Sequence, residues 1–426
     1  FFVFCCFLLE PMAFFAASLA VGVAAARQPH AVEVGGAPCT SAHDCYLGGD
    51  CVNGACVCDA WRASSNCSQL HLAPSRPGHV NVYPSHSNWS SWGAQVIRVD
   101  SKYHMYTARM ANRCGLNSWW CNSEIVHAEA DQPDGPFITI DDPIVLPFAH
   151  NPAVAVASDG TIVIFHIGSG TTPTEKQGNC SSGISNANKT ETKEWCGAQM
   201  ESPPPLAAPP QMGTKWSTPN IVYSASGNPR GPWTLLKGNS SWGADNPAPL
   251  FLPNGTALLY AKFPCNETIN PGAKAACYQY GLLRSNEGWR GEWRFVRMLE
   301  VFGEDVTAWQ DQRGNFHMIL QGGPYSGTSS PKLSSCKGHF HLADSSDGLE
   351  WTMRCDVAIL PSAQSVVAIP LSNGSVVKLR RRERQYVFLG PDRAPLWWYN
   401  GVAGLDYDSD AGADRTYSSA QPFFQR

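Results

Sequence analysis

The feature that most constrains this chain is a recurring turn signal followed by a short apolar or alternating run. The signal occurs at Asp100-Ser101, Asp159-Gly160, Asn254-Gly255, Arg313-Gly314 and Asn373-Gly374. Dipeptides of this kind favour the tight turns of β-hairpins. Successive signals lie 59, 95, 59 and 60 residues apart. The long interval contains an insertion, roughly residues 170–215, without which the period returns.

A second marker keeps the same period and ends on an aromatic residue late in each unit. It occurs four times, as Gly135-Pro136-Phe137, Gly231-Pro232-Trp233, Gly291-Glu292-Trp293 and Gly348-Leu349-Glu350-Trp351. Five units of about 59 residues, each a small antiparallel meander, are typical of sheets repeated around an axis. The sequence therefore predicts an all-β fold, with a five-bladed β-propeller over residues 80–426.

The composition agrees with many short strands and excludes several classes of partner. The chain of 426 residues has 38 Gly, 32 Pro and 15 Trp but only 15% charged residues, a globular balance that is rich in turns. Its formal net charge is -4, with a single short basic run. We therefore expect neither nucleic acid nor an anionic membrane as a main partner.

Residues 1–26 have the pattern of a signal peptide. They are apolar and close with Ala24-Ala25-Ala26 before Arg27, small residues that signal peptidase can cleave. An uncleaved membrane anchor is the alternative, although Glu10 and Pro11 interrupt the apolar run. We expect a secreted or extracellular glycoprotein, because the chain carries eight sequons, at Asn66, Asn88, Asn179, Asn188, Asn239, Asn254, Asn266 and Asn373.

Six cysteines between residues 39 and 67 define a small module: Cys39, Cys45, Cys51, Cys56, Cys58 and Cys67. A segment this short buries too little apolar surface to fold alone, so disulfides must close it. The spacing C-x5-C-x5-C-x4-C-x-C-x8-C resembles that of epidermal growth factor-like modules. The resemblance implies first-third, second-fourth and fifth-sixth pairing. It also implies a cell-surface or matrix partner, unless the module is a spacer, and no calcium is expected there.

Eight further cysteines fall into pairs that are close in sequence. The expected disulfides join Cys114 with Cys121, Cys180 with Cys196, Cys265 with Cys277 and Cys336 with Cys355. Each would hold a loop within one blade. Cys5 and Cys6 lie in the predicted signal peptide and are set aside.

Polar and aromatic residues near the start of each unit are the candidates for a functional site. In a propeller the innermost strand of every blade borders the central channel, so side chains at one end of these strands converge. Hydrolysis of a glycosidic bond needs a carboxylic acid and an opposing carboxylate, which Glu304, Asp245 and Asp305 would supply. The other candidates are Ser85, His86, Trp89, Trp92, His150, Asn151, Asn246 and the run Arg380 to Arg384.

These motifs resemble the five-bladed glycoside hydrolases typified by arabinanases, β-xylosidases and invertases. The resemblance covers about residues 80–402 and rests on His150-Asn151-Pro152, Asp245-Asn246-Pro247, Glu304-Asp305 with Trp309, Arg313 to His317, and Ser346 to Trp351. It implies an Asp base on the first blade, an orienting Asp on the second and a Glu acid on the third. This chain has Ser85-His86, His150 and Asp245 at those places, and Glu304 lies in the fourth unit.

Two functions follow from these residues. The first is a secreted glycoside hydrolase acting on poly- or oligosaccharide, with Glu304 as the acid and Asp245 or Asp305 as the opposing carboxylate. Sugar would contact His150, Asn151, Trp92, His86, Arg382 and Arg384. The second function is non-catalytic glycan binding or cell-surface adhesion. Two carboxylates that face each other favour the enzyme, whereas a single carboxylate held by arginine favours binding.

Each candidate also has a purely structural interpretation. Asp245 can cap a turn, Glu304-Asp305 can pair with the arginine run, and His150 can satisfy a backbone group. Arg380, Arg382 and Arg384 would share one strand face, either in solvent or bound to a carboxylate or sulfate of an acidic polysaccharide. The histidines lack close ligand spacing, so no metal site is expected. No cofactor is expected beyond a structural cation that the channel could hold.

Overall fold

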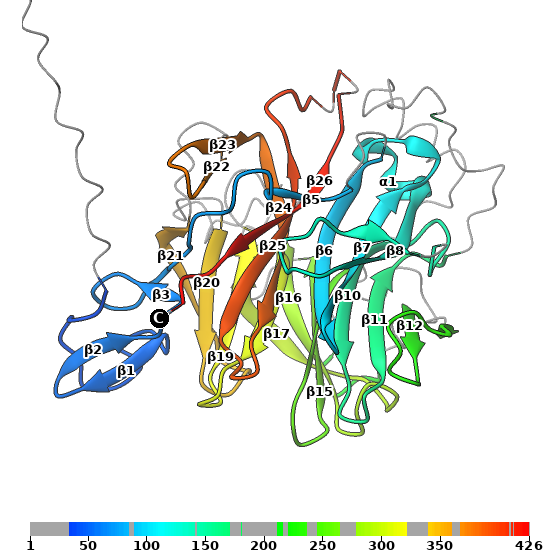
Figure 1. The fold of residues 1–426 in the computed structure, drawn as a ribbon. Helices are drawn as coiled ribbons and strands as arrows, with labels where there is room; N and C mark the ends of the chain where they lie inside the picture. Colours follow the sequence, from blue (N-terminus) through cyan, green and yellow to red (C-terminus); the bar gives the residue numbers. More distant parts are fainter. Residues whose placement is uncertain are drawn as a thin grey trace, which may run out of the picture.

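The computed structural model is a ring of five four-stranded antiparallel sheets (Figure 1), which confirms the predicted all-β propeller. It describes residues 34–84, 89–140, 143–170, 180, 211–215, 220–236, 245–264, 278–321, 340–359, 367–408, 410–411 and 413–425. The predicted signal peptide lies outside the described residues. Among these residues, no helix is both long and apolar enough to cross a membrane.

The first four blades each use consecutive strands, ordered from the axis outward. Blade 1 is β6 (Ser91–Val99), β7 (Lys102–Met110), β8 (Ser123–Ala130) and β9 (Ile138–Thr139). Blade 2 is β10 (His150–Val156), β11 (Ile162–Ile167), β12 (Asn220–Ser224) and β13 (Thr234–Leu236). Blade 3 is β14 (Asp245–Phe251), β15 (Ala257–Pro264), β16 (Tyr278–Ser285) and β17 (Arg294–Phe302). Blade 4 is β18 (Glu304–Gln310), β19 (Phe316–Gln321), β20 (Phe340–Ser345) and β21 (Thr352–Ile359).

Blade 5 combines strands from both ends of the propeller sequence. It contains β24 (Arg381–Leu389), β25 (Pro395–Ala403), β26 (Tyr417–Pro422) and, at its outer edge, β5 (Asn81–Tyr83). β5 pairs antiparallel with β26, with Tyr83 opposite Ser418. Because β5 precedes blade 1 in the chain, this pairing closes the ring and covers the edge of β26.

One of the five turn signals has a different role from the one predicted. The first four join the two inner strands of blades 1 to 4, at the end of the ring opposite the strand starts. Asn373-Gly374 instead joins β22 (Val367–Pro370) to β23 (Val376–Leu379), a separate two-stranded sheet. The inner turn of blade 5 follows Leu389. The dipeptide specifies a hairpin locally, but it does not specify which sheet the hairpin joins.

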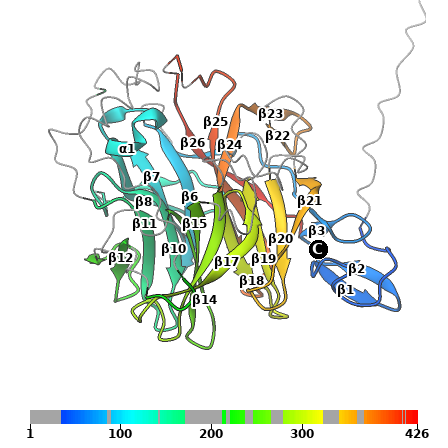
Figure 2. The same ribbon diagram turned by 180° about the vertical axis from the view of Figure 1, so that it is seen from behind.

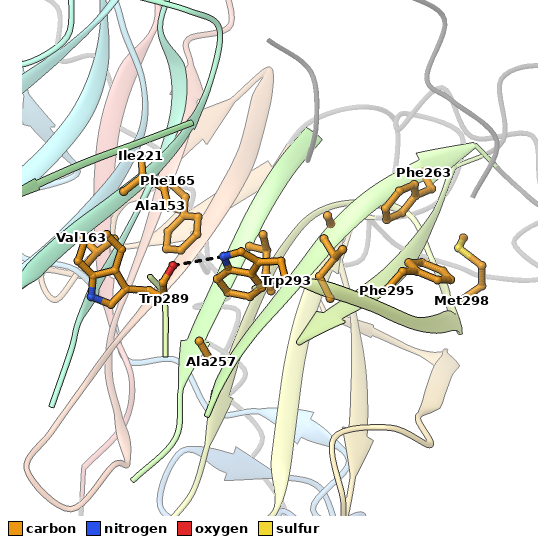
Figure 3. Close-up of a cluster of buried hydrophobic side chains, with 13 residues drawn as sticks. Ala153, Val163, Phe165, Ile221, Ala257, Phe263, Trp289, Trp293, Phe295 and Met298 are labelled. Atoms are coloured by element: carbon orange, nitrogen blue, oxygen red, sulfur yellow. Dashed lines mark hydrogen bonds between the residues drawn. The ribbon is translucent and has the colours of Figure 1, made fainter. Parts of the chain in front are cut away.

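The aromatic residue of the second marker packs between blades. Trp293, on the outer part of blade 3, lies in a buried cluster with Phe165 and Ile221 of blade 2 (Figure 3). Its indole Nε1 donates a hydrogen bond to the carbonyl of Trp289 (3.3 Å). Phe137 lies in the cluster between blades 5 and 1, and Trp351 lies in the cluster between blades 3 and 4. Trp233 packs at the edge of the cluster between blades 1 and 2.

The cysteine-rich module folds as two small hairpins beside the propeller. It contains β1 (Gly49–Val52), β2 (Ala55–Cys58), β3 (Arg62–Ala63) and β4 (Gln69–Leu70). Its disulfides are Cys39–Cys51, Cys45–Cys56 and Cys58–Cys67, which confirms the first-third, second-fourth and fifth-sixth pairing. Together with a further bridge in the propeller, they indicate folding in an oxidising compartment. Membership of the epidermal growth factor-like family stays a prediction.

The pairing predicted within the first propeller loop is wrong. Cys114 bonds to Cys180 rather than to Cys121, so Cys180 does not pair with Cys196 either. Cys121 is disulfide-bonded as well. The bridge spans 66 residues and ties the loop after β7 to the long insertion that follows β11. Cys196, Cys265, Cys277, Cys336 and the side chain of Cys355 lie outside the described residues.

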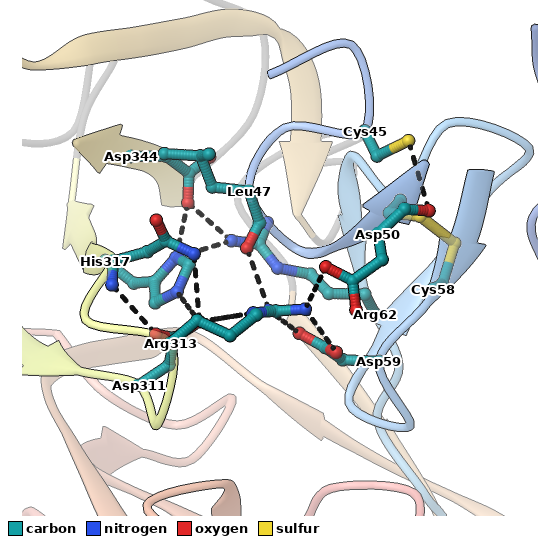
Figure 4. A network of polar contacts seen from close by, with 12 residues as sticks. Cys45, Leu47, Asp50, Cys58, Asp59, Arg62, Asp311, Arg313, His317 and Asp344 are labelled. Atoms are coloured by element: carbon teal, nitrogen blue, oxygen red, sulfur yellow. Dashed lines mark hydrogen bonds and ion pairs between the residues drawn. A yellow bond between two sulfur atoms is a disulfide. The ribbon is translucent and has the colours of Figure 1, made fainter. Parts of the chain in front are cut away.

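The module is docked on blades 4 and 5, not tethered as a spacer (Figure 2). Trp61 is buried in the cluster between these blades, where its ring meets that of Trp309 edge-on at 5.5 Å. The neighbouring Arg62 is fully buried. Its Nη2 lies 2.5 Å from Oδ1 of Asp344 and 3.2 Å from Nδ1 of His317 (Figure 4).

A second arginine joins the module to the propeller from the opposite direction. Arg313 of blade 4 bonds to Asp59 of the module (2.6 Å) and to Asp311 of its own turn (3.0 Å), as Figure 4 shows. Burial by itself would raise the pKa of Asp344, but Arg62 and then His317 outweigh it and lower this pKa to about 2. The contact is therefore an ionised network that connects two parts of the chain.

Replacing Arg62 should destabilise the whole chain. Arg62→Ala leaves the buried Asp344 without its main charged partner, and breaking such a pair costs about 3–5 kcal/mol. Urea unfolding followed by tryptophan fluorescence measures this loss. Lys102→Ala is the matched control, because the Lys102–Asp131 pair is exposed to solvent and should contribute little to stability. Equal effects of the two changes would contradict a structural role for Arg62.

Acid should weaken the docking of the module. The pKa of Asp344 is about 2 in the folded protein and about 3.9 in an unfolded chain. Its contribution to the free energy of unfolding is therefore fully present above pH 4 and disappears as the pH falls toward 2. Urea unfolding between pH 5 and pH 2 measures the slope. The double variant Arg62→Met/Asp344→Leu should show a shallower slope, and an unchanged slope would refute this origin.

Candidate functional site

The five innermost strands share one irregularity near their starts. In each of β6, β10, β14, β18 and β24 the register with the next strand shifts after the first residues. At each shift one residue has a positive φ, between 48° and 66°. These bulges turn one residue per blade toward the axis. We call these residues the axial ring: Gly93, Asn151, Asn246, Asp305 and Arg384.

Hydrogen bonds run around the axial ring from blade to blade. Nδ2 of Asn151 donates to Oδ1 of Asn246 (2.6 Å), and Nδ2 of Asn246 donates to Oδ1 of Asp305 (2.8 Å). Nη1 of Arg384 donates to the same carboxylate oxygen (3.0 Å), and its backbone N–H donates to Oδ2 (3.2 Å). The carboxylate only accepts, so it fixes the orientation of both amides.

That orientation leaves one acceptor open at the end of the series. Oδ1 of Asn151 is buried and has no hydrogen-bond partner among the described residues. The next ring position is Gly93, which has no side chain to fill the space. A Cβ there would lie 3.1 Å from Cβ of Arg384, whose side chain passes over the glycine. The series therefore ends in an amide oxygen at Asn151 that has no described partner, and Arg384 covers the glycine at the remaining ring position.

The residue before each ring position forms a second layer toward the strand starts: Trp92, His150, Asp245, Glu304 and Glu383. Nδ1 of His150 lies 2.6 Å from Oγ of Ser123. Burial, helped by the charge of Arg384, lowers the pKa of His150 well below its usual value, so this imidazole is neutral. The side chain of Asp245 lies outside the described part of the structure.

The described carboxylates of the axial ring and of the second layer each lie beside a cation. Asp305 binds Arg384, Glu304 lies 3.3 Å from Nζ of Lys262, and Glu383 makes a two-pronged contact with Arg381 (2.7 and 2.8 Å). Hydrolysis needs a protonated carboxylic acid opposite a second carboxylate. Among the described side chains the ring itself has one carboxylate, and arginine holds it.

A short helix places two aromatic side chains above this layer. α1 (Trp119–Asn122) follows two 3-10 turns, η1 (Ala111–Arg113) and η2 (Leu116–Ser118). Trp119 and Trp120 are half-buried and stack with their ring centroids 4.2 Å apart. The ring of Trp119 also lies 4.8 Å from that of His150. The sequence analysis missed this pair, although two adjacent tryptophans in a cysteine-bounded loop were a visible signal.

The structure separates the predicted arginines. Arg384 belongs to the axial ring, whereas Arg382 is fully buried inside blade 5. Its Nε bonds to Asn400 (2.7 Å), its Nη1 bonds to Gln421 (2.8 Å), and burial lowers its pKa to about 9. Arg382 therefore supports blade 5 and does not reach the channel. The bulge at Arg384 breaks the strict alternation on which the shared-face prediction rested.

The other residues that were predicted to contact sugar lie in different parts of the structure. Trp92 is buried beneath Arg381, whose guanidinium carbon lies 4.9 Å from the ring centroid. His150 and Asn151 lie at the bulge near the start of β10, the innermost strand of blade 2, and their contact with sugar stays a prediction. Ser85 and His86 lie outside the described residues. Lys262, on the neighbouring strand β15, is a site residue that the sequence analysis missed, whereas Asn246 was already a candidate.

Comparison with known proteins identifies structures with a similar fold but establishes no activity for this chain. The catalytic domain of a GH62 α-L-arabinofuranosidase from Coprinopsis cinerea superposes with a TM-score of 0.50 at 10% identity, over 84% of this chain and 97% of that one. A family 117 glycoside hydrolase from Zobellia galactanivorans gives 0.45 at 12%, over 84% and 90%. A thermostable family-43 glycoside hydrolase gives 0.47 at 11%, over 81% and 93%. No protein-family model and no curated protein matches.

The Asp305–Arg384 pair should be essential for the ring. Asp305→Asn removes the charge that faces a nearly buried guanidinium and should lower the free energy of unfolding by about 3–5 kcal/mol. Glu304→Gln is the control. Its side chain is 25% exposed, so loss of its contact with Lys262 should cost about 1 kcal/mol or less. Urea denaturation compares them, and a larger loss for Glu304→Gln would disprove the assignment.

Proposed function

We propose that this protein binds an oligosaccharide at the mouth of the propeller channel and holds it without hydrolysis. The observation that supports this proposal is the axial ring, in which Arg384 holds Asp305 and the other polar members are neutral amides. Such a ring can exchange hydrogen bonds with hydroxyl groups, but it has no second carboxylate to complete an acid–base pair. The fold is that of propeller glycoside hydrolases, and fold alone does not carry activity.

A sugar hydroxyl has the chemistry to complete the series of hydrogen bonds in the ring. It would donate to Oδ1 of Asn151, which has no partner among the described residues, and accept from an N–H of Arg384. A hydroxyl is both donor and acceptor, so it satisfies both groups at once. Filling a buried acceptor also removes a desolvation cost of about 1–3 kcal/mol. This gives the amides a role in binding that a carboxylate at either position would change.

The tryptophans of α1 supply the apolar part of the site. Sugar rings present C–H faces that pack on aromatic rings, and Trp119 and Trp120 stand next to His150. Three cations at the ring and beside the second layer are each paired with a carboxylate: Arg384 with Asp305, Lys262 with Glu304 and Arg381 with Glu383. We therefore expect a neutral sugar to be preferred over a sulfated or uronic acid-containing one.

A glycan array combined with a hydrolysis screen tests this function. The wild-type chain should bind a set of neutral oligosaccharides without releasing reducing ends, and Glu304→Gln should bind equally well. Trp119→Ala should weaken binding about tenfold, equivalent to about 1.4 kcal/mol. Phe424→Ala, an exposed aromatic change remote from the mouth, should leave affinity unchanged. Turnover by the wild type that Glu304→Gln abolishes would overturn the proposal in favour of a hydrolase.

A further inference from the structure

A second group of polar residues lies away from the channel, between blades 1 and 2. His104 on β7 stands directly opposite Glu129 on β8, and His127 precedes Glu129 by two residues on the same strand face. Nδ1 of His104 is 3.0 Å from Nε2 of His127 and 3.4 Å from Oε1 of Glu129. The third side of this triangle, from Nε2 of His127 to Oε1 of Glu129, measures 3.9 Å.

These separations, 3.0, 3.4 and 3.9 Å, bracket the edge length of a tetrahedral zinc site, so shifts of a few tenths of an ångström would bring all three atoms onto one ion. Zn²⁺ bonds to imidazole nitrogen and carboxylate oxygen at about 2.0–2.2 Å, so two tetrahedral ligands lie about 3.3–3.6 Å apart. The three side chains are nine-tenths or more buried, which holds their ligand atoms in place. Two imidazoles with one carboxylate is a ligand set that suits Zn²⁺ among common divalent cations.

The surroundings prepare the ligands for a cation. Burial lowers the pKa of His104, which favours the neutral imidazole that metals bind. Hydrogen bonding from Arg230 lowers the pKa of Glu129 and keeps it ionised. Tyr106 stacks on His127 with centroids 5.3 Å apart, and its hydroxyl donates to the carbonyl of Pro229 in blade 2. The triangle therefore lies where blade 1 contacts the connection between β12 and β13.

Arg230 both orients the carboxylate and opposes the cation. Its Nε and Nη2 donate to Oε1 and Oε2 of Glu129 at 2.7 and 2.8 Å. A carboxylate has about four lone-pair sites, so Oε1 can still face the histidines. The arginine side chain is 52% exposed, which lets it move and opens a route from solvent. Its positive charge would nevertheless weaken cation binding. Lys102 is the other nearby cation, and Asp131 pairs with it.

We propose that Nδ1 of His104, Nε2 of His127 and Oε1 of Glu129 bind one Zn²⁺ ion, with water in the fourth position. The ion would join β7 to β8 and, through Glu129 and Arg230, blade 1 to blade 2. Its burial and its distance along β7 and β8 from the channel mouth give it a structural role. It is independent of any sugar at the axial ring.

Zinc titration of the full secreted chain tests this site. After dialysis against a chelator, ZnCl₂ alone should bind with one ion per chain by calorimetry and by metal analysis, and should raise the thermal unfolding midpoint. Co²⁺ in its place should give the visible absorption of a four-coordinate site. Failure of the folded wild-type chain to bind a stoichiometric Zn²⁺ ion would overturn the proposal.

Variants assign the ion to these residues. His104→Asn and Glu129→Gln should each weaken zinc binding at least tenfold, whereas His43→Gln, at an exposed position in the module, should not change it. Arg230→Gln should tighten binding several-fold because it removes the opposing charge. Circular dichroism establishes that each variant is folded. Undiminished stoichiometric binding in both ligand variants would place the ion elsewhere and refute this site.

Discussion

Closure of the ring is the constraint on which this structure depends. A sheet between two others must bury both faces, so every blade needs a well-packed neighbour on each side. β5 closes blade 5 by pairing with β26, although the two strands lie at opposite ends of the propeller sequence. The cluster between blades 4 and 5 also takes in Trp61 from the cysteine-rich module. That module is therefore part of the propeller's packing, with Arg62 buried beside Asp344.

The geometry of the channel mouth follows from the same closure. Five equivalent bulges direct one residue per blade to the axis, so the five residues can be compared position by position. One acid, one base, two amides and one glycine give a ring whose charges cancel and whose hydrogen bonds converge on Asp305 from both sides. A carboxylate in place of Asn246 would face Asp305 directly, because the amide of Asn246 donates to that carboxylate. The proposal of binding without hydrolysis rests on this single ring carboxylate and its arginine partner.

How far the sequence predicts this structure depends on how local each feature is. Asn254-Gly255 and Asn373-Gly374 both form hairpin turns, but only the first lies within a blade. Cys114 was paired with its near neighbour, whereas folding brings Cys180 to a Cα distance of 5.0 Å. Alternation placed Arg382 and Arg384 on one face, and the bulge separates them. The spacing of His104 and Glu129 along the chain did not indicate that the two side chains are close, because they are neighbours only across two paired strands.

The sequence by itself determined the inner hairpins of blades 1 to 4 and the disulfide order of the module, because turn chemistry and cysteine spacing act over a few residues. The predicted number of blades is correct, although the fifth turn signal lies outside blade 5. Only the tertiary structure decided that β5 completes blade 5, that Trp61 enters the propeller core and that Asn151, Asn246, Asp305 and Arg384 meet. These contacts join residues far apart in the chain. Their geometry depends on backbone bulges and on closure of the whole ring, which no short segment encodes.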